Sequence, residues 1–150
     1  MSLDPYTTGM ISTRPDFPHT EIRSSVVAVL KAVRDERGLV LIPQRTRCFR
    51  SQDIHEILLT DELGAGPGVT VNRVASIAFV GFEQGGVVAE GDVLTKDSLV
   101  IGEVVGFDET HAPNHINIVV RNSNRASGIE LGIQLREKLI FGSEQRSDHA

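Results

Sequence analysis

The densest group of side chains that could do chemistry lies between Asp108 and Asn117. This segment contains two imidazoles, two carboxylates and two amides. Two imidazoles with a carboxylate form a common ligand set for zinc or iron, and a histidine beside a carboxylate is a common acid–base pair. The candidate catalytic residues are His111, His115 and Asp108, which are also the candidate ligands of a divalent transition metal, and Asn114 and Asn117 are candidate ligand-binding residues.

The same segment also fits a purely structural loop between two strands. Pro113 disfavours a helical turn, so His111 and His115 need not share a helix face. In the strand that His115 opens, the apolar residues alternate from Ile116 to Val120, which directs His115 and Asn117 outward or into a subunit interface. In the structural interpretation, the polar side chains cap a turn and the histidines lie on the surface.

A second polar group consists of Arg45, Arg47 and Arg50, in a segment without any acidic residue. Ser51 follows them and is a favourable residue to begin a helix. Arginine side chains near a helix N-terminus can bind a carboxylate or a phosphate, so these three are candidate ligand-binding residues. The alternative is a solvated strand whose arginines pair with acids elsewhere. Cys48 is the sole cysteine and is predicted to be structural rather than a nucleophile.

The elements that must position these residues are predicted to be mostly strands. Apolar runs at 26–30 and 39–42 flank the turn-like sequence 35–38, which favours a hairpin. The segment 51–59 differs, because its isoleucine and leucine residues recur at helical spacing after Ser51, and it predicts one short helix.

The remaining strands are separated by glycine turns at close spacing. They are predicted at 69–82, 93–94, 99–107, 115–121 and, by strict alternation, 129–135, before a turn near 136–138. This pattern predicts a mainly β fold, a small closed or partly open antiparallel β-barrel with one or two short helices. The predicted organisation is an irregular N-terminal arm over 1–24, one barrel domain over 25–142 and a C-terminal tail over 143–150.

The composition narrows the classes of partner. The chain has 150 residues, of which 40% are hydrophobic, and a formal net charge of −5. A mildly acidic chain is a poor partner for nucleic acid or for an anionic membrane. A single cysteine excludes an internal disulfide, and no apolar run reaches the length of a membrane helix. These features predict a cytoplasmic protein without nucleic-acid or membrane partners.

Three segments resemble the glucitol/sorbitol-specific A component of the bacterial sugar phosphotransferase system. They are Gly91-Asp92-Val93-Leu94, Ile101-Gly102-Glu103-Val104-Val105-Gly106 and His115-Ile116-Asn117-Ile118-Val119. The resemblance implies a small bacterial β-barrel and a phosphocarrier that uses a histidine. The family's histidine-bearing segment before the Gly-Asp turn has no counterpart in this chain.

The leading functional hypothesis is that the barrel binds a small anionic or sugar-like molecule at the Asp108–Asn117 loop, with an arginine from 45–50 as counter-ion. The alternatives are a phosphocarrier that uses His111 or His115, a metal-dependent enzyme that uses the same two histidines, and a non-catalytic structural protein that forms a homo-oligomer through its polar strand.

Overall fold

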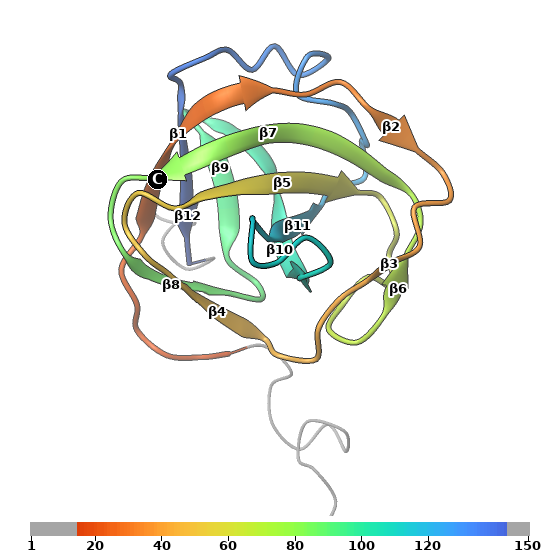
Figure 1. The fold of residues 1–150 in the computed structure, drawn as a ribbon, viewed down its shortest axis with the longest axis horizontal. Coiled ribbons are helices and arrows are strands. Elements are labelled where there is room, and N and C mark those ends of the chain that lie inside the picture. The colour runs from red at the N-terminus through yellow and green to blue at the C-terminus, as the bar shows by residue number, and fades with distance from the viewer. Residues whose placement is uncertain (1–14, 144–150) are drawn as a thin grey trace, which may run out of the picture.

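Seven strands close into a barrel in the computed structural model, which describes residues 15–143 (Figure 1). In the order in which they pair, the barrel strands are β1 (Ile22–Val29), β12 (Lys138–Gly142), β9 (Val93–Lys96), β10 (Leu99–Asp108), β11 (Asn117–Arg121), β5 (Ile54–Thr60) and β7 (Val74–Phe82), which pairs again with β1. The prediction of a mainly β fold with a closed barrel is therefore confirmed. No helix long and apolar enough to cross a membrane occurs in the described part of the chain.

Five further strands lie around the barrel. They are β2 (Val33–Arg34), which pairs with β7, and two ribbons in which β3 (Leu39–Val40) pairs with β6 (Thr70–Val71) and β4 (Thr46–Phe49) pairs with β8 (Gly86–Ala89). One barrel pairing departs from the predicted antiparallel arrangement, because β5 and β11 run parallel.

The predicted helix over 51–59 is wrong, and residues 15–143 contain no helix at all. The segment is β5, which pairs with β7 on one side and with β11 on the other. Ile57 and Leu59 belong to the main core cluster, whereas the intervening Leu58 packs in a second cluster outside the barrel wall. A strand that is buried on both faces does not alternate between apolar and polar residues. The apolar residues of this segment therefore matched the spacing expected of a helix.

The predicted hairpin of 26–30 with 39–42 is also wrong. The first run lies in β1, which pairs with β12 and β7, and the second lies partly in β3, which pairs with β6. Closure of the barrel requires β1 to pair with two distant strands, and this long-range pairing replaces the local one. Local turn signals do not report such pairings.

The predicted strand over 129–135 is wrong as well, because the described chain forms turns from Ser127 to Glu137 and strand β12 begins only at Lys138. The Glu130 carboxylate accepts a hydrogen bond from the N–H of Ser127, and the Ser127 hydroxyl accepts one from the N–H of Glu130. These reciprocal bonds fold the chain locally and prevent it from extending.

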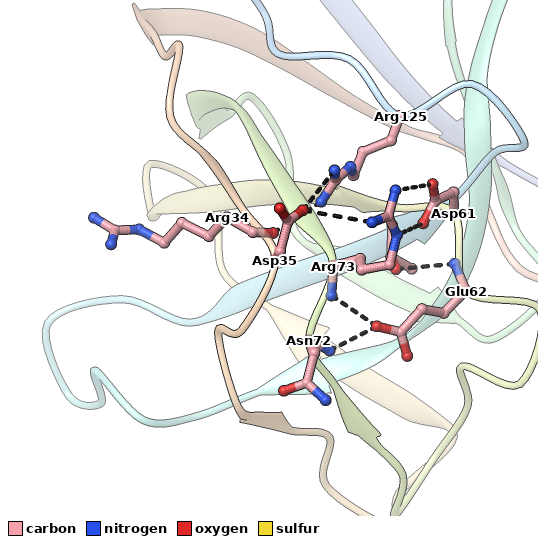
Figure 2. A network of polar contacts seen from close by, with 8 residues as sticks. Arg34, Asp35, Asp61, Glu62, Asn72, Arg73 and Arg125 are labelled. Atoms are coloured by element: carbon pink, nitrogen blue, oxygen red, sulfur yellow. Dashed lines mark hydrogen bonds and ion pairs between the residues drawn. The ribbon is translucent and has the colours of Figure 1, made fainter.

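A network of charged side chains ties the surface loops together at one edge of β7 (Figure 2). Arg73 bonds both oxygens of Asp61 at 3.0 Å, and the Oδ1 of Asp35 accepts a bond from Arg125 at 2.8 Å. Arg125 also donates to the main-chain carbonyl of Arg34. Exposed ion pairs such as that of Arg73 add little to stability, so the main effect of the network is to fix the course of β2 and the turn after it.

A buried ion pair joins the segment before β1 to the turn before β9. His19 Nε2 lies 2.8 Å from Asp92 Oδ1, and its Nδ1 lies 2.9 Å from the carbonyl oxygen of Phe17. Because both ring nitrogens face acceptors when Asp92 is ionised, the arrangement favours the imidazolium form. Burial alone would lower the pKa of His19, but these hydrogen bonds outweigh it and raise the pKa. Burial raises the pKa of Asp92, and the bonds from Ala89 and His19 offset it only in part.

We predict that Gly128→Ala destabilises the barrel strongly. A Cβ at this position would lie 1.9 Å from the carbonyl oxygen of Ile77, and the N–H of Gly128 bonds the carbonyl of Ser76 at 3.0 Å. The backbone has little freedom to relieve this clash, so the free energy of unfolding should fall by about 1–3 kcal/mol or more. Chemical denaturation measures the change.

The matched control is Gly64→Ala. No atom lies within 4 Å of a Cβ built on Gly64, so its free energy of unfolding should stay within about 0.5 kcal/mol of the unmodified protein. Equal stability of the two variants would show that the chain after β11 does not pack against β7 as described.

Candidate ligand-binding pocket

A pocket of about 360 Å³ lies between β4, the beginning of β5 and the loop that precedes β11. We call it the His55 pocket. Its lining residues are Arg47, Cys48, Arg50, Asp53, Ile54, His55, Ala112, Pro113, Asn114, His115 and Ile116. The volume lies within the range of small-molecule sites. The pocket therefore combines part of the predicted arginine segment with part of the predicted histidine loop.

His55 is a buried histidine of β5 with one nitrogen occupied and one free. Its Nδ1 accepts the main-chain N–H of Ile116 at 3.0 Å, which leaves the proton of the neutral ring on Nε2. That Nε2 is buried and has no hydrogen-bond partner. The ring packs edge-on against Phe49 and Phe82, with centroids 5.0 and 5.7 Å away. The aromatic packing and the Ile116 bond thus fix the orientation of the ring.

The environment of His55 favours the neutral form. Burial lowers the pKa of His55, the Asp53 carboxylate opposes this effect only in part, and the positive charge of Arg47 adds to the lowering. Asp53 Oδ2 lies 3.7 Å from Nε2, which is too long for a direct hydrogen bond. The neutral ring therefore offers an N–H donor beside a carboxylate acceptor, and both residues line the pocket.

Two guanidinium groups border the same space. Arg47 bonds Glu109 at 2.8 Å and lies over the ring of Phe49 at 5.5 Å from its centroid. The Arg50 side chain is 91% exposed and reaches Asp53 only at 3.9 Å. Arg50 therefore has a long, exposed ion pair and can reorient toward an incoming anion at little cost.

His115 forms the boundary between this pocket and the outer face of the barrel. Asn114 Nδ2 donates to its Nδ1 at 2.8 Å, so the proton of the neutral ring is on Nε2. This Nε2 is buried without a hydrogen-bond partner and lies 3.5 Å from Glu56 Oε1. The ring also stacks on His111, with centroids 5.0 Å apart. Arg37 approaches Nε2 of His111 at 3.4 Å, and neither of these two residues lines the pocket.

Asp108 and Asn117 lie behind the loop and not in the pocket. Asn117 Nδ2 donates to Asp108 Oδ2 at 2.9 Å, and the Thr110 hydroxyl donates to Asp108 Oδ1 at 2.6 Å. Both residues are buried. The side chain of Asn117 is on the outer side of β11, as predicted. It is nevertheless buried, because the preceding loop and the second core cluster cover that side.

Two further predicted site residues, Arg45 and Asp108, lie outside the pocket. Arg45 forms an ion pair with Glu90 at 2.5 Å. Asp108 bonds Thr110 and Asn117 and does not line the pocket. Within residues 15–143, no group of three or more His, Cys, Asp or Glu side chains is arranged to hold a metal ion.

A comparison with known protein families finds one matching family model. A family model described as a family of unknown function (DUF6917) matches residues 16–142. The chain belongs to this family. No curated protein and no solved structure matches the chain. The matched residues of this DUF6917 member include every strand and all residues of the His55 pocket.

Three residues of this DUF6917 member, Asp53, His55 and Glu56, were absent from the candidates that the sequence suggested. All three belong to the segment that was predicted to be a helix, where His55 would have been on the surface. Had the segment been interpreted as a strand, His55 and Ile57 would share the inner face and Glu56 the outer one. The signal that could have identified these residues is the polar pair His55-Glu56 directly before the apolar run 57–59.

We predict opposite shifts for two histidines in one NMR titration. The pKa of His55 should be below the ordinary value of 6.5 and that of His19 above it. The contribution of His55 to stability is present above pH 6.5 and is lost as the pH falls toward its lowered pKa, because only the unfolded chain then takes up the proton. The contribution of His19 is present below pH 6.5 and is lost as the pH rises through its raised pKa.

The two signals are assigned with the variants His55→Gln and His19→Gln. A His55 ring that titrates above 6.5 would contradict the burial that lowers its pKa. A His19 ring that titrates below 6.5 would contradict its pairing with Asp92.

Proposed function

We propose that this protein binds a small hydroxylated anion, such as a sugar acid or a sugar phosphate, in the His55 pocket. The observation that supports this most directly is the buried, unpartnered Nε2 of His55 beside the Asp53 carboxylate, in a pocket that two arginines border. Buried polar groups in folded proteins are normally bonded, so an unpartnered N–H in a pocket suggests a missing ligand group.

The gap between Nε2 and Asp53 Oδ2 suits a hydroxyl group. A hydroxyl can accept the N–H of His55 and donate to the carboxylate at the same time. The distance of 3.7 Å between the two protein atoms is too long for their own bond. A sugar or sugar acid supplies such hydroxyls, whereas an aliphatic ligand would leave both protein groups unsatisfied.

The anionic part of the ligand is proposed to contact Arg50 and Arg47. A guanidinium donates two parallel hydrogen bonds to a carboxylate or a phosphate, which gives both affinity and orientation. Arg50 is exposed and only loosely paired, and Arg47 can exchange Glu109 for the ligand. Asn114 on the opposite wall supplies an amide to a further hydroxyl. Binding, rather than a chemical reaction, is the function that these contacts support.

The test is an NMR titration of the full chain with four probes: D-gluconate, D-glucose 6-phosphate, D-glucose and inorganic phosphate. We expect the two hydroxylated anions to bind more tightly than neutral glucose and than phosphate, because only they satisfy both parts of the pocket. Arg50→Ala should weaken binding about tenfold or more, since a charge-assisted hydrogen bond contributes about 1.5–3 kcal/mol.

Asp53→Asn keeps the shape of the side chain but removes the charge that orients the hydroxyl, and it should also weaken binding. Arg23→Ala is the matched control, since Arg23 is an exposed arginine of β1 outside the pocket, and it should bind normally. The proposal fails if neither hydroxylated anion shifts signals of the pocket, or if Arg50→Ala and Asp53→Asn both bind as well as the control.

A further inference from the structure

A second concave site lies on the outer face of the barrel wall and shares no lining residue with the His55 pocket. It has a volume of about 480 Å³ and is lined by Ala32, Arg34, Glu36, Arg37, Glu56 and Ser76. We call it the Glu56 groove. Figure 1 shows β5, β7 and β2 side by side, and these strands, with the turn after β2, supply its walls.

The floor of the groove holds the carboxylate of Glu56, whose polar contact with the barrel is long. The Glu56 side chain is only 15% exposed, and its nearest polar neighbour is the Nε2 of His115 at 3.5 Å, beyond a normal hydrogen bond. A largely buried carboxylate that has only this long contact calls for a group that donates hydrogen bonds and carries positive charge.

The rim of the groove holds two guanidinium groups that no carboxylate neutralises in the described structure. Figure 2 shows that the Arg34 side chain extends away from the network in which Arg73 and Arg125 bind Asp35 and Asp61. Arg37 contacts a neutral acceptor, Nε2 of His111, at 3.4 Å. The two cations are thus available to an anionic group of a ligand.

We propose that the Glu56 groove binds a small zwitterion of the amino-acid class. The ligand ammonium donates to the Glu56 carboxylate and to the Ser76 hydroxyl on the floor. The ligand carboxylate is held by Arg34 and Arg37 on the rim, and its side chain faces solvent. One ligand molecule thus pairs with Glu56 on the floor and with Arg34 and Arg37 on the rim. Neither a simple anion nor a neutral sugar supplies both groups.

The test is a set of two-dimensional NMR titrations of the full chain with the standard L-amino acids, followed by the N-acetyl and the amide derivatives of the tightest binder. We expect an amino acid to shift the amide signals of Ser76 and of 34–37, and both derivatives to bind at least about tenfold more weakly. Glu56→Gln and Arg37→Gln should each weaken binding by a similar factor while the thermal melt shows a folded protein.

Two controls separate this site from other effects. Glu83→Gln removes a carboxylate that pairs with Lys138 elsewhere on the barrel, and it should bind normally. Arg50 lines the His55 pocket and not the groove, so Arg50→Ala should also leave amino-acid binding unchanged. The inference is overturned if no amino acid shifts these signals, if the N-acetyl derivative binds as tightly as the free amino acid, or if Glu56→Gln binds like the control.

Discussion

The parallel pairing of β5 with β11 is the constraint on which the rest of the structure depends. It joins β11 to β5 in the barrel wall, and its register sets Glu56 beside Asn117 and Ile57 beside Ile118. One residue before this ladder, the N–H of Ile116 bonds the ring of His55, and the carbonyl of Ile116 accepts the N–H of Glu56 at 3.1 Å. The loop that carries His111 and His115 is therefore anchored directly to the strand that carries the buried polar groups.

Successive side chains of β5 point to opposite faces of the barrel wall, which divides its polar residues between two sites. His55 belongs to the face with Ile57 and lines the pocket bordered by Arg47 and Arg50, whereas Glu56 belongs to the opposite face and forms the floor of the outer groove. His115 lies between them, since it lines the pocket and its Nε2 approaches Glu56. A slip of one residue in the register would exchange the two faces and remove both sites.

The sequence was sufficient to predict a barrel, because its short β-rich runs and glycine turns have few other solutions. It also suggested Arg47, Arg50, Asn114 and His115, which line the pocket, because each belongs to a cluster of polar side chains. It could not identify His55 or Glu56, because β5 is buried on both faces and shows no alternation. Nor did it predict that the Asp108 carboxylate is buried against Asn117, because that burial depends on how the loop between β10 and β11 folds over this face.

The central claim is that His55 is held as a neutral ring whose Nδ1 is occupied by the protein and whose Nε2 proton is offered to a ligand. Long-range proton–nitrogen correlation NMR on histidine-labelled full-length protein tests it most directly, with His55→Gln to assign the signal. Above neutral pH, we expect His55 to have an unprotonated Nδ1 and a protonated Nε2, and D-gluconate to shift the Nε2 signal. A protonated Nδ1, or an Nε2 signal that no hydroxylated anion moves, would contradict the account.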